Sequence, residues 1–334
     1  MTLPDAPEDA VVPGGKPRLG VYRGTLVRAA LERWAGPMRM RFRSKWWQYV
    51  VALSDDVIAG AAVANLGYVG VAFALAWDRR ERRWYEREAL VPFAHGVTAE
   101  GEPGAGRFVY RGRAGRIAMS TSGEERTVEV ELATPSGPLE MELELAGPGE
   151  GTDALTVIGE LAPGGLNVTH KEAGVSLGGR IALGGREIEL APDNSTALLD
   201  WTRGVPPATV RWNWAMGAGR ARDGRTVGFN VCVGYTDPAH SENAVWVDGR
   251  VHSIGPVTFE ERGRDPWRIR TADGALDLTF QPEAERAANT HLVLVVSRYR
   301  QPVGTYTGHV PGPDGERIEL ERASGVAEDH MARW

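Results

Sequence analysis

Residues that could hold and activate a small molecule gather in one segment of the chain, from Leu199 to Gly249. This segment combines tryptophans with cationic, amide and carboxylate side chains: Asp200, Trp201, Arg211, Trp212, Trp214, Asn230, Glu242 and Asn243. A ligand cavity typically joins large apolar side chains to a few hydrogen-bonding groups that orient the ligand. The segment therefore predicts a small-molecule pocket, because core packing alone does not call for these polar residues beside the tryptophans.

Asp200 is the first candidate for proton transfer. It follows the apolar run Ala197–Leu199 and precedes the turn-like Arg203-Gly204, which places it at the end of a predicted strand. A carboxylate among aromatic rings is poorly hydrated, so it can serve as a general acid or base near neutral pH. The competing interpretation is that Asp200 only caps a turn, and the residues leave both interpretations open.

Three further residues could transfer or stabilise a proton. Glu242 and His252 flank the hairpin signal Asp248-Gly249, which predicts paired strands that bring the two side chains close enough to share a proton. His252 could equally be a structural residue of its strand. Lys171 is expected to act as a cation or oxyanion stabiliser, although its segment also resembles an exposed turn.

Strand periodicity predicts how the tryptophans are presented. In the stretch Val210–Met216, alternation places Trp212 and Trp214 on one face and Arg211 on the other. One of these faces must look into a barrel, so the tryptophans either fill a core or line a pocket. Trp46, at the start of another predicted strand, is a further candidate ligand contact.

Several common reaction centres are absent from the sequence. It has no phosphate-binding loop, no His-Glu-x-x-His, no Cys-x-x-Cys and no Gly-x-Ser-x-Gly elbow. The 7 histidines are scattered without metal-ligand spacing. We therefore expect neither a metal nor an organic cofactor, and we expect the single Cys232 to be an unreactive core or pocket residue in a reducing compartment.

Composition and charge exclude other classes of partner. The net charge is −6 with acids and bases interspersed, so no basic face is available for nucleic acid. The uncharged stretch Val57–Trp77 is long enough to span a bilayer, but Gly60, Asn65 and Gly67 interrupt it and indicate two strands joined by a bend. Residues 1–16 lack the apolar segment of a signal peptide. A cytoplasmic protein without a membrane span is expected, and its oligomeric state is left open.

The elements that must position these residues are predicted to be strands. The 42 glycines, many in turn-like pairs, favour many short strands, and the alternation through Thr127–Ala146 predicts a hairpin with its glutamates in water. We expect a flexible arm at residues 1–16, a first domain at 17–195 and a second at 196–334. Sheet closure removes exposed edges, so the expected architecture is all-β, with two antiparallel barrels or barrel-like sandwiches side by side and few short helices.

The motifs together resemble a known family. The segments Asp200–Gly204, Trp212–Trp214, Glu242–Ala244 and Gly325–Trp334, with Asp265-Pro266-Trp267 between them, are similar to the family called domain of unknown function 2804. The resemblance implies a lipocalin-like, or calycin, fold similar to carotenoid 1,2-hydratases and fungal decalin-forming cyclases. Those proteins hydrate or cyclise a hydrophobic polyene or polyketide without a metal or organic cofactor. The resemblance transfers no catalytic residue to this chain.

Three functions follow as hypotheses. The first is a cofactor-independent hydratase, cyclase or isomerase acting on a hydrophobic or polycyclic small molecule. In it, Asp200 transfers the proton, the tryptophans stabilise developing positive charge, and Arg211, Asn230 and Asn243 orient polar ends of the substrate. The second is a carbohydrate-active enzyme that uses Asp200 and Glu242 as its carboxylate pair. The third is a non-catalytic carrier.

Overall fold

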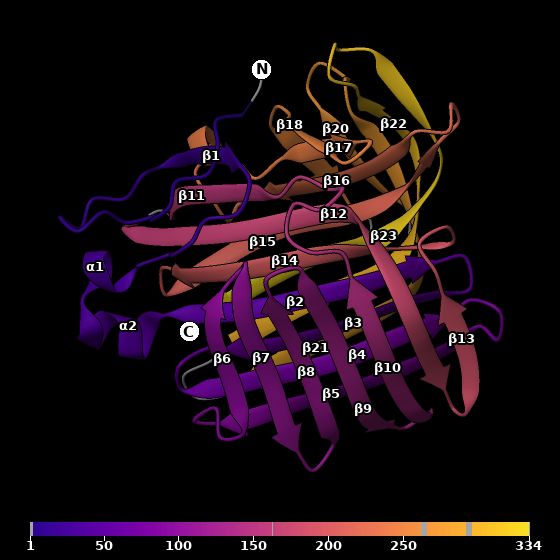
Figure 1. The fold of residues 1–334 in the computed structure, drawn as a ribbon, viewed down its shortest axis with the longest axis horizontal. Coiled ribbons are helices and arrows are strands. Elements are labelled where there is room, and N and C mark those ends of the chain that lie inside the picture. The colour runs from indigo at the N-terminus through magenta and orange to yellow at the C-terminus, as the bar shows by residue number, and fades with distance from the viewer. Residues whose placement is uncertain (1–2, 162, 262–265, 292–295, 334) are drawn as a thin grey trace.

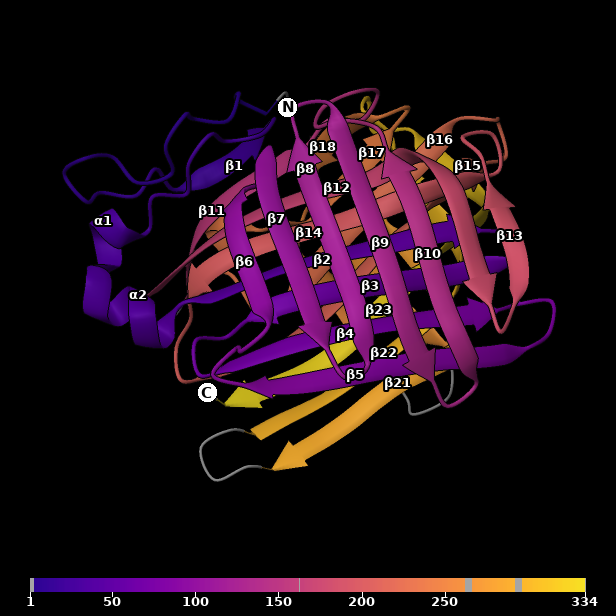
Figure 2. The same cartoon turned by 60° about the horizontal axis from the view of Figure 1, so that its bottom comes forward.

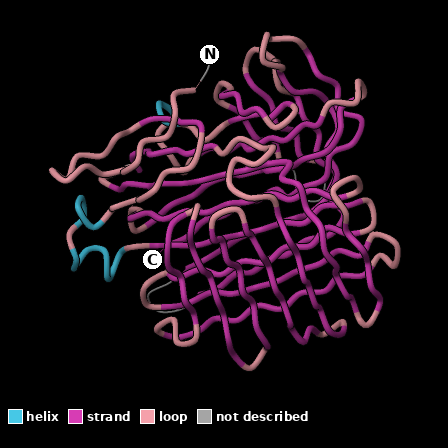
Figure 3. The backbone as a smooth tube through the Cα atoms, viewed as in Figure 1, coloured by secondary structure: helices cyan, strands magenta, loops and turns pink. Residues whose placement is uncertain are grey.

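The protein is built almost wholly of antiparallel strands (Figures 1 and 3). The computed structural model describes residues 3–161, 163–261, 266–291 and 296–333, so Asp265 and Trp334 of the motifs above lie outside the described residues. The short helical elements are α1 (Glu32–Ala35), α2 (Pro37–Arg43) and the 3-10 turn η1 (Pro238–His240).

The first sheet occupies the N-terminal two thirds of the chain. Its strands are β1 (Gly20–Arg23), β2 (Lys45–Ser54), β3 (Val57–Asn65), β4 (Val69–Asp78), β5 (Arg83–Pro92), β6 (Val97–Glu102), β7 (Ala105–Gly112), β8 (Gly115–Ser122), β9 (Glu125–Thr134), β10 (Gly137–Leu145), β11 (Leu155–Leu161), β12 (Gly165–Leu183), β13 (Arg186–Leu190) and β14 (Ser195–Val205). The main path runs β5-β4-β3-β2-β14-β12-β10-β9-β8-β7-β6.

This sheet folds over on itself, so that β6–β10 cross the strands β2–β5 (Figure 2). The long strand β12 belongs to both layers: its first half pairs with β11 and β14, and its second half pairs with β10 and β13. The register shifts between Ala173 and Val175, where Gly174 has a φ of 90° that favours glycine. A large apolar core, including Phe108, Ile117 and Trp201, fills the space between the layers.

The second sheet is a curled antiparallel sheet from the C-terminal third. Its strands are β15 (Thr209–Ala221), β16 (Thr226–Val233), β17 (Ala244–Val247), β18 (Arg250–Ser253), β19 (Val257–Glu260), β20 (Trp267–Thr271), β21 (Asp277–His291), β22 (Val296–Pro311) and β23 (Arg317–Arg333), in the order β18-β17-β16-β15-β23-β22-β21-β20-β19. Its own core contains Phe229, Trp267, Phe280 and Tyr306. The expected all-β architecture of two barrel-like antiparallel sheets is confirmed.

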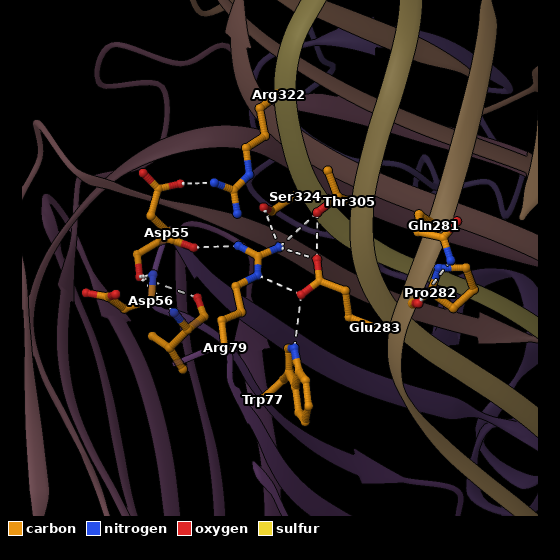
Figure 4. Close-up of polar contacts among 12 residues, drawn as sticks. Asp55, Asp56, Trp77, Arg79, Gln281, Pro282, Glu283, Thr305, Arg322 and Ser324 are labelled. Atoms are coloured by element: carbon orange, nitrogen blue, oxygen red, sulfur yellow. Dashed lines mark hydrogen bonds and ion pairs between the residues drawn. The ribbon is translucent and has the colours of Figure 1, made fainter. Parts of the chain in front are cut away.

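The two sheets pack against each other through a third apolar cluster and a saturated polar network (Figure 4). We call the latter the Arg79 network: the Arg79 guanidinium, just after β4, binds both oxygens of Glu283 on β21 at 2.9 Å. Trp77 Nε1 and Thr305 Oγ1 donate to the same carboxylate at 3.0 and 2.6 Å, and Arg79 also donates to Ser324 Oγ at 2.9 Å. These bonds connect the end of β4 to three strands of the second sheet.

The apolar stretch Val57–Trp77 forms β3 and most of β4, as two strands joined by a bend. Its continuous apolar character has a physical cause, because this part of the sheet is covered on both faces. Alternate residues such as Ala59 and Ala61 face the core of the first sheet, while Ile58 and Leu75 face the second sheet. No helix among the described residues is long and apolar enough to cross a membrane.

Two expected boundaries differ from the structure. Strand β14 lies between β2 and β12 in the first sheet, so the chain changes sheet at residues 206–208 and not near residue 195. The described part of the expected flexible arm, residues 3–16, is also attached to the body. Ala10 and Val11 are fully buried, and Asp9 binds Arg28 and Arg33 at 2.5 and 2.7 Å. The hairpin β17–β18 turns at Asp248-Gly249, both with positive φ, as the sequence predicts.

Candidate active site between the two sheets

A cavity of about 390 Å³ lies between the outer face of the first sheet and the facing strands of the second, and we call it the inter-sheet cavity. One wall, from β3 to β5, is largely apolar: Ala62, Ala64, Leu66, Val69, Val71, Phe73, Leu90 and Pro92. The rest of the lining, from β2, β12, β14 and the second sheet, carries ionisable and aromatic side chains. Two larger hollows elsewhere are lined mainly by turn residues and charged side chains, so neither combines an apolar wall with buried ions.

Strand alternation positions the side chains of the first sheet. Lys171, Asp200 and Tyr49 stand side by side on β12, β14 and β2, and the same row continues through Ala62 and Phe73 to Glu88. Successive residues of a strand point to opposite faces, so a whole row of cross-strand partners shares one face. All six residues line the cavity.

The second sheet contributes an equivalent row. Trp214 lies between Cys232 and Glu328, and Trp212 lies beside His330, which in turn faces Tyr299. The loop after β16 adds Tyr235 and Glu242. The cavity therefore needs both sheets, and neither one encloses it alone.

The centre of the polar side is an ion cluster of Lys171, Asp200 and Glu242, which we call the Lys171 cluster. Lys171 Nζ lies 2.7 Å from Asp200 Oδ1 and 3.3 Å from Glu242 Oε2. The three side chains are 5%, 11% and 4% exposed, so the ions are almost wholly removed from water. Burial alone would lower the pKa of Lys171, but the two carboxylates outweigh it and raise that pKa. Lys171 is therefore an ammonium at neutral pH.

The two carboxylates of the cluster differ in their hydrogen bonds. Asp200 accepts bonds from Trp47 Nε1 at 3.2 Å and from Thr202 Oγ1 at 3.1 Å, in addition to its ion pair. Glu242 Oε2 is buried without a hydrogen-bond partner, because its contact with Lys171 is an ion pair that does not meet hydrogen-bond geometry. Asp200 is thus fixed by hydrogen bonds, whereas Glu242 Oε2 has only its ion pair with Lys171.

Other polar atoms beside the cluster also lack partners. The hydroxyl of Tyr235 and the side-chain amide of Asn167 line the cavity and are buried without a hydrogen bond. Burial and the nearby Glu242 carboxylate raise the pKa values of the Tyr235 hydroxyl and the Cys232 thiol well above their usual range, so both keep their protons. Buried polar atoms normally find a partner, so these atoms are suited to bind polar groups of a ligand.

A second polar group lies across the cavity on β22 and β23. Glu328 accepts bonds from Trp212 Nε1 at 2.8 Å and Gln301 Nε2 at 2.6 Å, and His330 Nδ1 lies 3.2 Å from the same carboxylate. The other ring nitrogen of His330 is 3.0 Å from Ser297 Oγ. Burial would raise the pKa of Glu328, but its hydrogen bonds, led by that with His330, lower it.

A third group borders the apolar wall. The Arg286 guanidinium lies between the rings of Phe73 and Tyr299, 3.7 and 4.4 Å from their centroids, and binds Glu88. Tyr299 donates to Glu88 at 2.7 Å. Among the residues that the structure describes, the inter-sheet cavity is lined by two Lys or Arg side chains and four carboxylates: Lys171, Arg286, Glu88, Asp200, Glu242 and Glu328. This balance disfavours an anionic ligand and favours developing positive charge.

Five of the residues that the sequence singled out meet in the cavity. They are Lys171, Asp200, Glu242, Trp212 and Trp214. The sequence predicts that Asp200 and Trp201 begin a second barrel, but β14 belongs to the first sheet and pairs Asp200 directly with Lys171. The two residues are consecutive, so Trp201 points to the opposite face and packs with Trp46 in the core of the first sheet, at a ring separation of 6.3 Å.

The remaining predicted ligand contacts lie outside the cavity. Arg211 is on the solvent face of β15, with its side chain 70% exposed, and pairs with Asp329 at 3.5 Å. His252 lies opposite Val245, and strand pairing starts at Ala244, so the hairpin does not extend to Glu242. The structure therefore does not bring His252 and Glu242 together among its described contacts.

Asn230 and Asn243 support the cavity from behind and do not line it. Asn230 accepts a bond from Trp214 Nε1 at 2.8 Å and donates to the backbone oxygen of Glu242 at 2.9 Å. Asn243 Oδ1 accepts a bond from the backbone of Cys232 at 2.7 Å. Together they fix the loop that carries Glu242 against β16.

Sequence reasoning did not find several cavity residues, among them Trp47, Tyr49, Tyr235, Arg286, Ser297, Glu328 and His330. Trp47 and Tyr49 are two residues apart and share one face of β2, but the pattern does not say which face looks into the cavity. Tyr235 lies in the loop after β16, and the remaining residues come from strands that are far apart in the sequence. Within the described residues, no group of three or more histidine, cysteine or carboxylate side chains is arranged to hold a metal ion.

The chain matches one family model and is similar in fold to solved structures. Residues 5–334 match the family described as Domain of unknown function (DUF2804). The fold is similar to that of kievitone hydratase from Nectria haematococca, with a TM-score of 0.53, 11% sequence identity, and coverage of 85% of this chain and 88% of that one. CghA with Sch210972 matches at a TM-score of 0.48 and 14% identity, over 87% and 88% of the two chains. No curated protein matches the chain.

Proposed function

Because the chain belongs to the DUF2804 family, whose name assigns no activity, we propose a function from the inter-sheet cavity itself. The protein binds a largely apolar small molecule there and converts it by acid–base chemistry, as a cofactor-independent hydratase, cyclase or isomerase. The observation that carries this proposal is the Lys171 cluster, a buried group of ions that opens onto an apolar wall. The fold shared with kievitone hydratase, a protein named for hydration, supports it.

The lining defines the class of ligand. The aliphatic and aromatic wall of β3–β5 binds an apolar body, and the unpartnered atoms of Tyr235, Asn167 and Glu242 bind hydroxyl or carbonyl groups at one end. The excess of carboxylates over cations disfavours an acidic substrate. A neutral, mostly hydrocarbon compound with one oxygenated end satisfies these features.

In the proposed chemistry Glu242 transfers the proton and Asp200 positions Lys171. Asp200 has three donors and a fixed orientation, whereas Glu242 has an oxygen without a hydrogen bond. Lys171 contacts both carboxylates, so the cluster has a net charge of −1 while both are ionised and becomes neutral when Glu242 holds the proton. The Trp214 ring, 5.4 Å from Lys171 Nζ, is placed to stabilise positive charge that develops on an apolar substrate.

The other two hypotheses find less support. A carrier requires no buried ionisable groups beside its ligand. Burying the three ions of the Lys171 cluster costs several kcal/mol before their mutual attraction compensates, so their presence is better explained by a reaction than by binding alone. A glycosidase needs space between its two carboxylates for the sugar linkage. Lys171 Nζ occupies the position between Asp200 and Glu242.

The test begins with compounds that co-purify with the protein, identified by untargeted mass spectrometry. Each compound is then incubated with the protein in D₂O and in H₂¹⁸O. We expect deuterium or ¹⁸O to enter the product, and we expect the Glu242→Gln variant to slow that incorporation by about 10²–10⁴-fold, the usual range for loss of a general acid or base. Glu283→Gln, which changes a similar carboxylate in the Arg79 network, is the matched control and should leave the rate unchanged.

Two results would overturn the proposal. If a bound compound is retained but exchanges no isotope with wild-type protein, the cavity is that of a carrier. If incorporation proceeds equally in Glu242→Gln, the proton is transferred elsewhere. A retained oligosaccharide would instead favour the carbohydrate-active hypothesis.

A further inference from the structure

A second set of reactive side chains lies in the same cavity, away from the Lys171 cluster. Ser297 Oγ lies 3.0 Å from His330 Nε2, and His330 Nδ1 lies 3.2 Å from Glu328 Oε1. All three line the cavity. We propose that Ser297, His330 and Glu328 form a nucleophilic triad that cleaves esters with an apolar acyl group, an activity separate from the acid–base function proposed above.

The direction of the hydrogen bonds follows from the partners of Glu328. Both of its oxygens already accept bonds, from Trp212 Nε1 and Gln301 Nε2, and these groups can only donate. Glu328 is therefore held as an acceptor, so the proton between it and the imidazole belongs to His330 Nδ1. In a neutral imidazole the other nitrogen, Nε2, is then the acceptor and faces the Ser297 hydroxyl. This is the arrangement in which histidine acts as a general base toward serine.

Strand register explains why three residues from distant segments meet. Glu328 and His330 are two residues apart on β23, so both face the cavity. Ser297 on β22 lies directly opposite Ala332, which makes His330 its diagonal neighbour, within reach of a long side chain. The Trp212 ring packs 4.2 Å from the imidazole centroid and restricts its rotation.

The surroundings suit an ester. The apolar wall accepts an acyl chain, and the excess of carboxylates disfavours a free acid. Thr290 lies directly opposite Ser297 on β21 and also lines the cavity, so its hydroxyl is placed to donate to the carbonyl oxygen.

The proposed reaction has two balanced steps. Ser297 Oγ bonds to the ester carbonyl carbon while His330 Nε2 takes the hydroxyl proton, and the alcohol then leaves with that proton as its C–O bond breaks. Water next adds to the acyl-serine and gives a proton to His330. The carboxylic acid departs as Ser297 recovers its proton, so the only co-reactant is water.

A fluorophosphonate probe with an alkyl chain tests the nucleophile directly. The Ser297 oxygen displaces fluoride from phosphorus, and the adduct is located by intact mass and peptide mass spectrometry. We expect one adduct per chain, on Ser297, at a rate that falls by about 10²–10⁴-fold in His330→Gln. Ser297→Ala should carry no adduct. Ser324→Ala, a serine of the Arg79 network, should be labelled at the wild-type rate.

Further variants separate this proposal from the previous one. Glu242→Gln should lose isotope incorporation but keep full labelling of Ser297, whereas Ser297→Ala should do the reverse. Circular dichroism confirms that each variant is folded. No adduct on folded wild-type protein, or equal labelling in wild type and His330→Gln, would show that the triad is only a polar part of the sheet packing.

Discussion

The two sheets meet through two groups of ions that differ in how fully their polar atoms are paired. In the Arg79 network the Glu283 carboxylate accepts four bonds, from Arg79, Trp77 and Thr305. In the Lys171 cluster, Asp200 is similarly held, but Glu242 Oε2 and the neighbouring Tyr235 hydroxyl have no hydrogen bond. The first group is fully hydrogen-bonded across the packing of the sheets, whereas the second contains buried polar atoms without a hydrogen bond, the feature on which the proposed ligand site rests.

The largest expected effect comes from removing the cation of the Lys171 cluster. Lys171→Met leaves two buried carboxylates without a counter-ion, so we expect the free energy of unfolding at pH 8 to fall by about 3–5 kcal/mol. The loss should be smaller at pH 5, where a proton can replace the ammonium. Denaturant unfolding at both pH values measures the loss of unfolding free energy. Arg180→Met, which breaks an exposed pair with Glu142, is the control, and an equal cost in both variants would contradict the role of burial.

Removing the cation of the Arg79 network should lower the free energy of unfolding by a smaller amount. Glu283 is 23% exposed, so water can partly replace Arg79 after the change Arg79→Met. We expect a loss of about 1.5–3 kcal/mol, the range for hydrogen bonds to charged groups. Under conditions where the variant is folded, its labelling at Ser297 and its retention of co-purified compounds should match wild type. A loss of either would show that the two groups are not independent.

Lowering the pH should remove the contribution of Glu283 to stability, an effect smaller than that of Arg79→Met. Burial would raise the pKa of Glu283, but the bonds from Arg79 and Thr305 outweigh it and hold that pKa below the ordinary 4.5. The stabilisation is therefore present above pH 4.5 and is lost as the pH falls through the lower folded-state value. Glu283→Gln should be about 1 kcal/mol less stable than wild type at pH 7. Unfolding curves of the two proteins should converge in acid, and a constant gap would contradict the ion pair.

The smallest effect on stability is expected from removing the Tyr235 hydroxyl, which has no hydrogen bond. Tyr235→Phe removes no hydrogen bond, so the free energy of unfolding should change by less than about 0.5 kcal/mol. Binding of a co-purified compound should still weaken by up to about tenfold, because one bond to the ligand is lost. Tyr306→Phe is the matched control, since its hydroxyl donates to Val326 O at 2.6 Å and its loss should cost about 1 kcal/mol. Unchanged affinity in Tyr235→Phe would contradict ligand contact.

The sequence predicted the architecture better than the arrangement of the site. Alternation through Thr127–Ala146 and the turn at Asp248-Gly249 indicated hairpins that the structure confirms, because local turn and face preferences decide them. The segment from residue 57 to 77 was also correctly divided into two strands. The catalytic roles of Lys171, Asp200 and Glu242 stay predictions, although the structure brings the three together.

The rest depended on information that a single strand does not contain. Trp46 and Trp47 are adjacent, and only the packing of the first sheet decides that Trp47 faces the cavity. In the closing segment, Glu328 and His330 alternate with Asp329 and Met331, so polar residues occur on both faces and periodicity cannot tell them apart. The contact of Ser297 with His330 depends on the register of β22 with β23, which no local pattern specifies.

The position of the cavity on the seam between the sheets has a consequence for how the protein could be divided. Strand β14 ends at Val205 and β15 begins at Thr209, so residues 206–208 tether Asp200 and Lys171 to the half that carries Trp214 and Glu242. This short tether keeps the two halves at a high effective concentration. Two separate polypeptides cut there would each lack half of the reactive groups. Any activity that they recovered on mixing would depend on protein concentration. That activity would therefore measure the association of the two fragments.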